Sequence, residues 1–132
     1  MTSNTTPHSQ CAELIARFYH ALDASDYTAL ASLLEADTVW LRQGKELTGP
    51  DAIIEALGQR HAERRTAHQL QNLYVTLDES GTTATAKYYV NVYDNQGPSG
   101  SLQLKVIMVS EDQFALRDGR WRLLAKRAGK WL

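Results

Sequence analysis

Apolar residues in the first half of the chain recur every three or four positions, which is the spacing of a helix with one buried face. This spacing predicts three helices, over residues 9–24, 27–35 and 48–65. Pro7 suits the first turn of the first helix, Ser9 is also a suitable cap, and Asp26 suits the N-cap of the second helix. Between the second and third helices, residues 37–47 alternate around Gly44 and predict two short strands joined by a turn.

After Arg65 the apolar residues alternate with polar ones, which is the pattern of β-strands with one buried face. This alternation predicts four long strands, over residues 66–78, 82–94, 101–116 and 120–127. Turns that contain glycine separate these strands, so we expect consecutive antiparallel hairpins.

The order of the elements predicts the fold class. Helices followed by a run of long strands are typical of an α+β domain, here with three N-terminal helices packed on a mainly antiparallel sheet. Long strands twist, so we expect the sheet to be strongly curved and to form, with the helices, a cone that encloses a cavity. The domain is expected to occupy residues 9–132, and the polar residues 1–8 to form a disordered tail.

Charge and composition narrow the class of protein. A net charge of -1 over 132 residues gives no electrostatic reason to expect nucleic acid or an anionic membrane surface as a partner. No apolar run is long enough to cross a bilayer, and the first residues lack the apolar segment of a secretory signal. Cys11 is the only cysteine, which excludes an internal disulfide framework and permits a reducing compartment. We therefore expect a cytoplasmic protein.

The segment TAHQLQN, at residues 66–72, places polar side chains at the start of a strand. Because side chains alternate along a strand, we expect His68, Leu70, Asn72 and Tyr74 on one face. This face is either a wet outer surface or the lining of the cavity. In a cavity, His68 would transfer protons and Asn72 would orient a substrate oxygen. At the rim or in the core, both side chains would only satisfy backbone groups.

Asp23 lies on one helical stripe with Ile15 and Tyr19, beside the predicted core. Partial burial and the negative end of the helix macrodipole are both expected to raise the pKa of the Asp23 carboxyl. A raised pKa suits a general base or a proton-sharing partner, and the alternative is a solvated aspartate at the helix end. Trp40, in a short strand, is a candidate for lining the pocket, with core or interface packing as the alternative.

The strand over residues 82–94 carries two rows of side chains. Tyr88 belongs to a row of alanines and valines that we expect to face the helices, whereas Tyr89 lies with Asn91 and Tyr93 on a more polar row. Tyr89 is therefore a candidate for donating a hydrogen bond to a substrate oxygen, or for contributing to a dimer interface.

Basic residues at two further places are expected to be solvated. Arg42 lies at the turn between the two short strands. In the last strand the alternation places basic side chains on the outer face or at the sheet edge, with an interface role or phosphate binding as alternatives. These residues are Arg120, Arg122, Lys126, Arg127 and Lys130.

Four strings resemble the NTF2-like superfamily and are most similar to its SnoaL-like, scytalone-dehydratase-like branch: YHALDASDYTALASLLEAD, GPDAIIEAL, RTAHQLQN and DGRWRLLAKR. The resemblance spans nearly the whole chain and implies an NTF2-like cone. In the dehydratase-like members, an aspartate late in the first helix and a histidine early in the first long strand work together in the cavity. Asp23 and His68 stand at the matching places, whereas Leu22 replaces a tyrosine of the dehydratases.

The residues and the resemblance together imply a cofactor-independent lyase, isomerase or cyclase that acts on a small, apolar, ring-bearing metabolite of polyketide, steroid or terpenoid type. Asp23 and His68 are the expected acid/base pair. The candidate substrate-binding residues are Tyr19, Trp40, Asn72 and Tyr89. No nucleotide-binding or nucleophile motif is present and the histidines lack metal-ligand spacing, so neither a cofactor nor a metal is expected.

The alternative is a non-catalytic protein that uses the same fold. It would be a ligand-binding module, or a structural subunit resembling the β-subunit of ring-hydroxylating dioxygenases. In either case we expect a homodimer formed through the outer face of the sheet, because an exposed curved sheet that bears tyrosines and leucines usually finds a partner.

Overall fold

The computed structural model describes residues 6–96 and 98–132. The elements are α1 (Pro7–Asp23), α2 (Tyr27–Ser32), β1 (Leu34–Arg42), β2 (Lys45–Thr48), α3 (Gly49–Gly58), β3 (Thr66–Leu77), β4 (Thr83–Asp94), the short 3₁₀ turn η1 (Pro98–Gly100), β5 (Gln103–Arg117) and β6 (Arg120–Lys130). The strands form one open, six-stranded sheet in the order β2-β1-β6-β5-β4-β3. The expected α+β class is confirmed.

The pairing of the strands is mainly antiparallel, as expected. The four long strands β3 to β6 are consecutive antiparallel neighbours, which confirms the hairpins predicted from the glycine-containing turns. One pairing is different, because β1 runs parallel to β6, with Leu34 opposite Leu123 and Trp40 opposite Lys126. The sheet is therefore mixed, and the first strand of the chain lies beside the last.

The helices lie close to their predicted positions but differ in length. α1 begins at Pro7, inside the segment expected to be a tail, and its N-cap is Thr6, whose hydroxyl accepts a hydrogen bond from the Ser9 backbone N–H at 3.2 Å. Residues 1–5 lie outside the described residues. α2 and α3 end earlier than predicted, at Ser32 and Gly58. Only α1 and α2 precede the sheet in the chain, since α3 follows β2.

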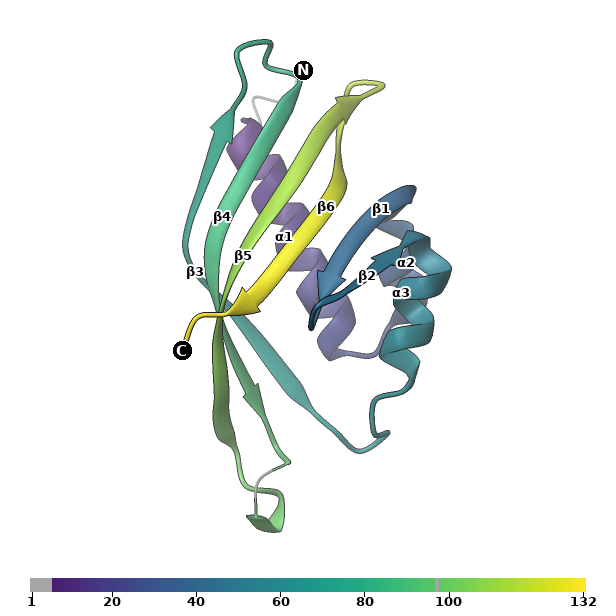
Figure 1. Ribbon diagram of the computed structural model, residues 1–132, viewed down its shortest axis with the longest axis vertical. Coiled ribbons are helices and arrows are strands. Elements are labelled where there is room, and N and C mark those ends of the chain that lie inside the picture. Colours follow the sequence, from purple (N-terminus) through teal and green to yellow (C-terminus); the bar gives the residue numbers. More distant parts are fainter. Residues whose placement is uncertain (1–5, 97) are drawn as a thin grey trace, which may run out of the picture.

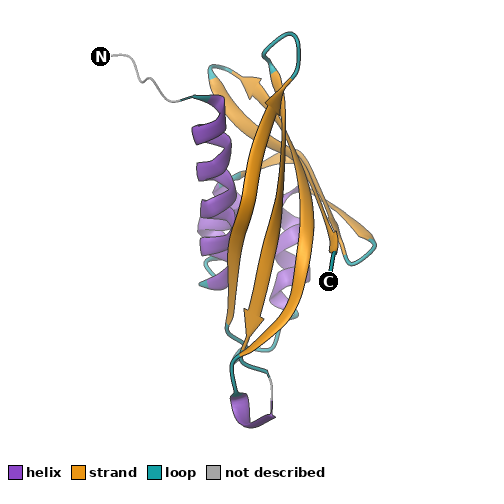
Figure 2. Ribbon diagram, turned by 90° about the vertical axis from the view of Figure 1, so that its left-hand side faces the viewer, coloured by secondary structure: helices purple, strands orange, loops and turns teal. Residues whose placement is uncertain are grey.

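The core lies between α1 and the sheet. α1 runs behind the long strands in Figure 1 and along one face of them in Figure 2. The helix buries Cys11, Ile15, Phe18, Tyr19 and Leu22. The apolar row of β4 is buried on the same side, as predicted, and consists of Ala84, Ala86, Tyr88, Val90 and Val92. Within the described residues, no helix is both long and apolar enough to span a bilayer.

A β-bulge in β3 changes the face on which half of the strand lies. The register between β3 and β4 shifts between Gln71 and Tyr74, and Asn72 adopts a left-handed backbone with φ of 57°. Leu73 and Val75 therefore face the core, and Tyr74 is 56% exposed. The prediction that Asn72 and Tyr74 share the face of His68 is wrong, because one extra residue at the bulge reverses the alternation.

A second bulge buries a lysine. The pairing of β5 with β6 shifts between Gln113 and Phe114, after which Lys126 faces the core and is 1% exposed. Its Nζ donates hydrogen bonds to Asp112 Oδ2 at 2.5 Å and to Tyr88 Oη at 2.6 Å. The prediction that Lys126 is solvated is therefore wrong. Asp112 and Lys126 form a buried ion pair at the centre of the sheet.

Candidate active site

Asp23 and His68 lie in direct contact, as the resemblance implies. Asp23 is the last residue of α1, His68 is the third residue of β3, and packing of α1 on β3 brings the two side chains together. The distance between His68 Nδ1 and Asp23 Oδ1 is 2.6 Å. The backbone N–H of His68 donates to Oδ2 at 3.0 Å, and the Thr66 hydroxyl donates to Oδ1 at 2.8 Å. Three donors therefore hold the Asp23 carboxylate.

These hydrogen bonds set the charge of Asp23. Burial alone would raise the pKa of the Asp23 carboxyl, but hydrogen bonds from the His68 ring, the His68 backbone and the Thr66 hydroxyl outweigh burial and lower it. The expectation of a raised pKa is therefore wrong, because helix geometry alone does not reveal donors supplied by β3. An ionised carboxylate next to Nδ1 favours the imidazole tautomer that carries its proton on Nδ1.

The other ring nitrogen of His68 is the one available for chemistry. Among the described residues, Nε2 has no hydrogen-bond partner. The ring stacks on Tyr19, with 4.9 Å between the centroids and 19° between the planes, so its orientation is fixed from two sides. A neutral imidazole held in this way presents a basic nitrogen whose partner nitrogen is already bonded to a carboxylate.

His68 lines a cavity of about 150 Å³ between the helices and the sheet. A space of this size holds a molecule of roughly the size of benzene. Most of its wall is apolar or aromatic. The apolar lining consists of Tyr19, Leu22, Trp40, Leu57, Val92, Val106, Met108 and Ala128. Two of the four candidate substrate-binding residues, Tyr19 and Trp40, therefore line the cavity together with His68.

The other two candidates, Asn72 and Tyr89, lie elsewhere. Neither lines this cavity. Both border a shallow depression that they share with Lys87 and Val109, and the Tyr89 ring packs on Trp131 with 5.9 Å between centroids. Asn72 is turned away by the bulge in β3. Tyr89 belongs to the row of β4 opposite the buried one, so its phenol lies on the outer face of the sheet.

Three arginines line the cavity that the sequence reasoning did not place there: Arg42, Arg60 and Arg64. The prediction that Arg42 is solvated at a turn is wrong. The period of the strand contained a signal, since Arg42 lies two residues after Trp40 and so shares its face. Arg60 joins the Asp23–His68 pair indirectly, because its Nη2 donates to the Thr66 hydroxyl at 2.9 Å. No group of three or more His, Cys, Asp and Glu side chains that could hold a metal ion occurs in residues 6–96 and 98–132.

Solved structures share this fold at low sequence identity. A hexachlorocyclohexane dehydrochlorinase (LinA) of type 2 is 18% identical with a TM-score of 0.82, over 94% of this chain and 84% of that one. Aln2 from a Streptomyces species is 21% identical with a TM-score of 0.80, over 97% and 94%. A candidate dehydratase of the NTF2-like family from Streptomyces avermitilis is 20% identical with a TM-score of 0.77, over 93% and 95%.

Comparison at the level of sequence gives the family. No curated protein matches the chain significantly. The family model described as "SnoaL-like domain" matches residues 5–127, which is nearly the whole chain. The chain therefore belongs to the SnoaL-like family, within the NTF2-like fold that its solved neighbours share.

Proposed function

We propose that this protein catalyses proton transfer at carbon without a cofactor, as a lyase, isomerase or cyclase acting on a small ring-bearing molecule. The observation that carries the proposal is the contact between the Asp23 carboxylate and His68 Nδ1 at the wall of an aromatic cavity. A histidine held by a carboxylate is a common general base in enzymes. LinA, a neighbour in fold, is named as a dehydrochlorinase, so the fold accommodates elimination chemistry.

The chemistry divides into two steps. His68 Nε2 takes a proton from a substrate carbon, and Asp23 stabilises the imidazolium that forms. In an elimination, the electron pair of the broken C–H bond forms a C=C bond, the leaving group departs with its own bonding pair, and the imidazolium then releases its proton to water. In an isomerisation or cyclisation, the pair is delocalised into an adjacent carbonyl, and the imidazolium returns its proton to the substrate at another atom.

The walls of the cavity are suited to binding an apolar ring next to His68. Trp40 is 6% exposed and the ring of Tyr19 lies against His68, so flat aromatic surfaces stand next to the base. Such surfaces bind apolar rings and exclude water from the reacting atoms. A purely structural subunit has no need of this cavity. A binding protein without turnover would use the cavity but would not need His68 as a base.

The experiment that tests the proposal measures proton transfer itself. The purified protein is incubated in D₂O with a panel of small cyclic ketones and halogenated rings, and loss of C–H signals is followed by NMR. We expect His68→Ala and Asp23→Asn to slow exchange by about 10²–10⁴-fold, which is the usual contribution of a general base. His20→Ala and Asp26→Asn are matched controls, since His20 is exposed on α1 and asparagine also serves as an N-cap.

The outcomes separate catalysis from simple binding. Exchange that survives in His68→Ala, at the rate of the wild-type protein, would remove His68 from the mechanism. Ligands that bind to the wild-type protein and to His68→Ala equally, with no exchange in either protein, would identify a binding module rather than an enzyme.

A further inference from the structure

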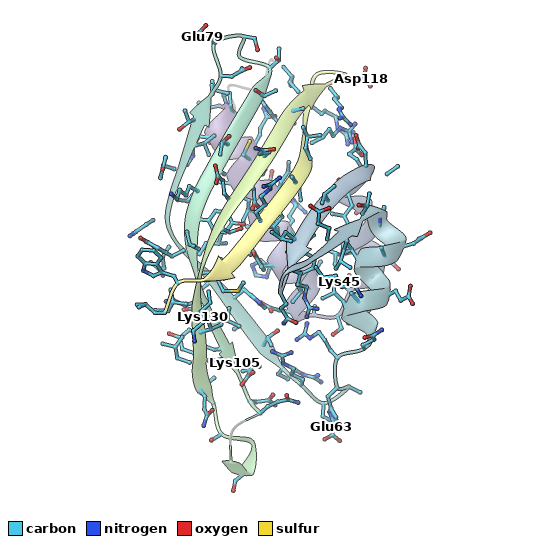
Figure 3. The ribbon with its side chains drawn as sticks, viewed as in Figure 1. Lys45, Glu63, Glu79, Lys105, Asp118 and Lys130 are labelled. Carbon is cyan, nitrogen blue, oxygen red and sulfur yellow. The ribbon has the colours of Figure 1, made fainter. Side chains whose placement is uncertain are left out.

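The charges around the cavity are unbalanced. Four cationic side chains line it, namely Arg42, Arg60, Arg64 and Lys105. No aspartate or glutamate is among the described residues that line it. In Figure 3, Lys105, on β5, lies in the lower half of the view, as do Lys45 and Glu63.

Among the described residues, Asp94 is the only carboxylate that forms an ion pair with any of these four cations, and Asp23 acts on Arg60 at longer range. Asp94 Oδ2 is 3.5 Å from Arg64 Nη2 and 3.4 Å from Lys105 Nζ, so one carboxylate serves two cations. Burial and then the charge of Arg64 lower the pKa of Arg60, and Tyr27 and Asp23 oppose this only in part. The Asp23 oxygens already accept hydrogen bonds from the side chains of β3. Four cations and two carboxylates leave two positive charges in excess.

Arg42 has no counter-charge in the described protein. Its only attractive side-chain contact there is with the ring of Trp40, at 5.6 Å from the guanidinium carbon to the ring centroid. Burial, followed by the positive charges of Arg60 and Arg64, lowers the pKa of Arg42. Burial and the repulsion between the arginines both make the positive charge of Arg42 unfavourable at this place. An anion bound beside the three guanidinium groups would offset that cost.

Two other donors of the cavity wall are buried without an acceptor in the described residues. They are the indole N–H of Trp40 and the Nε–H of Arg64. Both unsatisfied groups are donors, and an apolar ligand would leave them unpaired at a cost. Both atoms are inaccessible from the cavity as it stands, so an oxygen atom of a ligand would reach them only if neighbouring side chains shift.

We propose that Arg42, Arg60 and Arg64, which we call the arginine cluster, bind a carboxylate of the ligand, so that the substrate is a small ring-bearing acid. The planar fork of arginine matches a carboxylate. The apolar wall formed by Tyr19 and Trp40 fits the ring to which that carboxylate is attached, and a free inorganic anion would make no use of it. This inference rests on the proposed function for the chemistry of the ring but not for binding of the anion.

Binding of a matched pair of probes tests the anion site. Benzoate and benzamide have the same shape and differ in charge, so calorimetry at fixed ionic strength compares them directly. We expect the wild-type protein to bind benzoate and to bind benzamide at least about 10-fold more weakly. Arg42→Gln should weaken benzoate binding by about 10- to 100-fold, as for loss of a hydrogen bond to a charged group, and leave benzamide unchanged. Arg42→Lys, which keeps the charge and loses the fork, should fall between the two.

The control variants are chosen to isolate the cluster. Arg120→Gln removes an exposed arginine whose side chain has no partner in the described residues, and it should bind benzoate like the wild-type protein. Equal affinity for benzoate and benzamide, or equal weakening by Arg42→Gln and Arg120→Gln, would overturn the anion site.

Three further results are decisive in different ways. Inorganic phosphate that displaces benzoate at equal concentration would overturn the assignment to a ring-bearing carboxylate. Proton exchange on neutral ketones without any benzoate binding would overturn this inference and leave the proposed function standing. Benzoate binding that depends on Arg42, without proton exchange on any substrate, would support the anion site and contradict the proposed function.

Discussion

Asp23 shows how neighbours on another element decide the charge of a single residue. Its position at the end of α1 suggests a raised pKa, yet the donors on β3 lower it. A carboxyl whose pKa is lower in the folded than in the unfolded protein stabilises the fold at pH values above its unfolded pKa, and this contribution is lost as the pH falls through the folded value.

This linkage predicts how stability depends on pH. Asp23→Asn removes the contribution, so at neutral pH the variant should have a smaller free energy of unfolding than the wild-type protein. The difference should shrink as the pH falls below the ordinary carboxyl value of 3.8, where the wild-type protein also loses it. Urea unfolding of both proteins at about pH 7, 5 and 3 measures the difference. A difference that is constant across this range would contradict the linkage.

Cys11 gives a second prediction at this scale. Burial, with a smaller effect of the Asp112 charge, raises the pKa of the Cys11 thiol to about 11. The thiolate is the reactive form, so at about pH 8 we expect thiol reagents to label the native protein only as fast as it unfolds. Labelling measured against denaturant concentration checks this. Rapid labelling of the native protein would show that the α1 interface opens locally.

The candidate site could be predicted in part from single residues. Asp23, His68, Tyr19 and Trp40 follow from the helical stripe, the strand period and the family resemblance. Arg42 was not predicted to line the cavity, because a charged residue next to a turn is usually solvated. The sequence does place it two residues after Trp40, and therefore on the same face of the strand. Arg60 and Arg64 fall within the helix predicted over residues 48–65, but α3 ends at Gly58, so both lie in the connection to β3, where helical spacing does not give the direction of a side chain.

At the scale of elements, the bulges in the β3–β4 and β5–β6 pairings mark the limit of prediction. The strands themselves were predicted to within a few residues, because alternation is a strong local signal. A bulge inserts one residue and reverses the faces beyond it, and this depends on pairing with the neighbouring strand rather than on local sequence. Asn72 and Lys126 were both misplaced for this reason.

The bulge in the pairing of β5 with β6 carries a prediction on stability. Lys126→Met would leave the Asp112 carboxylate buried and unpaired, which typically costs about 3–5 kcal/mol of the free energy of unfolding. The double variant Lys126→Met with Asp112→Leu should recover most of this loss, since well-packed apolar residues often replace a buried ion pair at little cost. Chemical denaturation measures all three proteins.

An exposed ion pair provides the control. Arg117 Nη2 lies 3.2 Å from Asp37 Oδ2 at the surface, and Arg117→Ala should change stability very little. If Lys126→Met lowers the free energy of unfolding by no more than Arg117→Ala does, Lys126 does not form the ion pair with Asp112 in solution.

At the scale of the whole molecule, the outer face of the sheet predicts a homodimer. Large apolar side chains stay exposed on β3 and β5, in the loop before β5 and on the C-terminal segment, namely Tyr74, Leu104, Leu102, Trp131 and Leu132. A cluster of this kind is typical of an interface. We expect light scattering to give the mass of a dimer and Trp131→Glu to shift it toward monomer, with His20→Ala as a control. A monomeric wild-type protein at high concentration would refute the expectation.

Hairpins between consecutive strands could be predicted at this scale, and the parallel pairing could not. Turn sequences reveal which neighbours in the chain are neighbours in the sheet. The contact between β1 and β6 joins segments that are separated by most of the chain, and no local pattern encodes it. The hydroxyl of Thr38, which donates to the carbonyl of Leu123 at 2.7 Å, shows how such a contact is fixed once it forms.

The parallel pairing also determines the order in which parts of the fold can form while the chain is being synthesised. As the chain leaves the ribosome from its N-terminus, α1 and β3 can bring Asp23 to His68 well before β6 exists. β1, which carries Trp40 and Arg42, can pair early with β2, but it joins the rest of the sheet only when residues near Leu123 have been made. Long-range pairing of this kind is a slow step in folding. We expect the wall of the cavity that β1 forms to be completed last. In a nascent chain, the contact between Asp23 and His68 would then form before the cavity around it is complete.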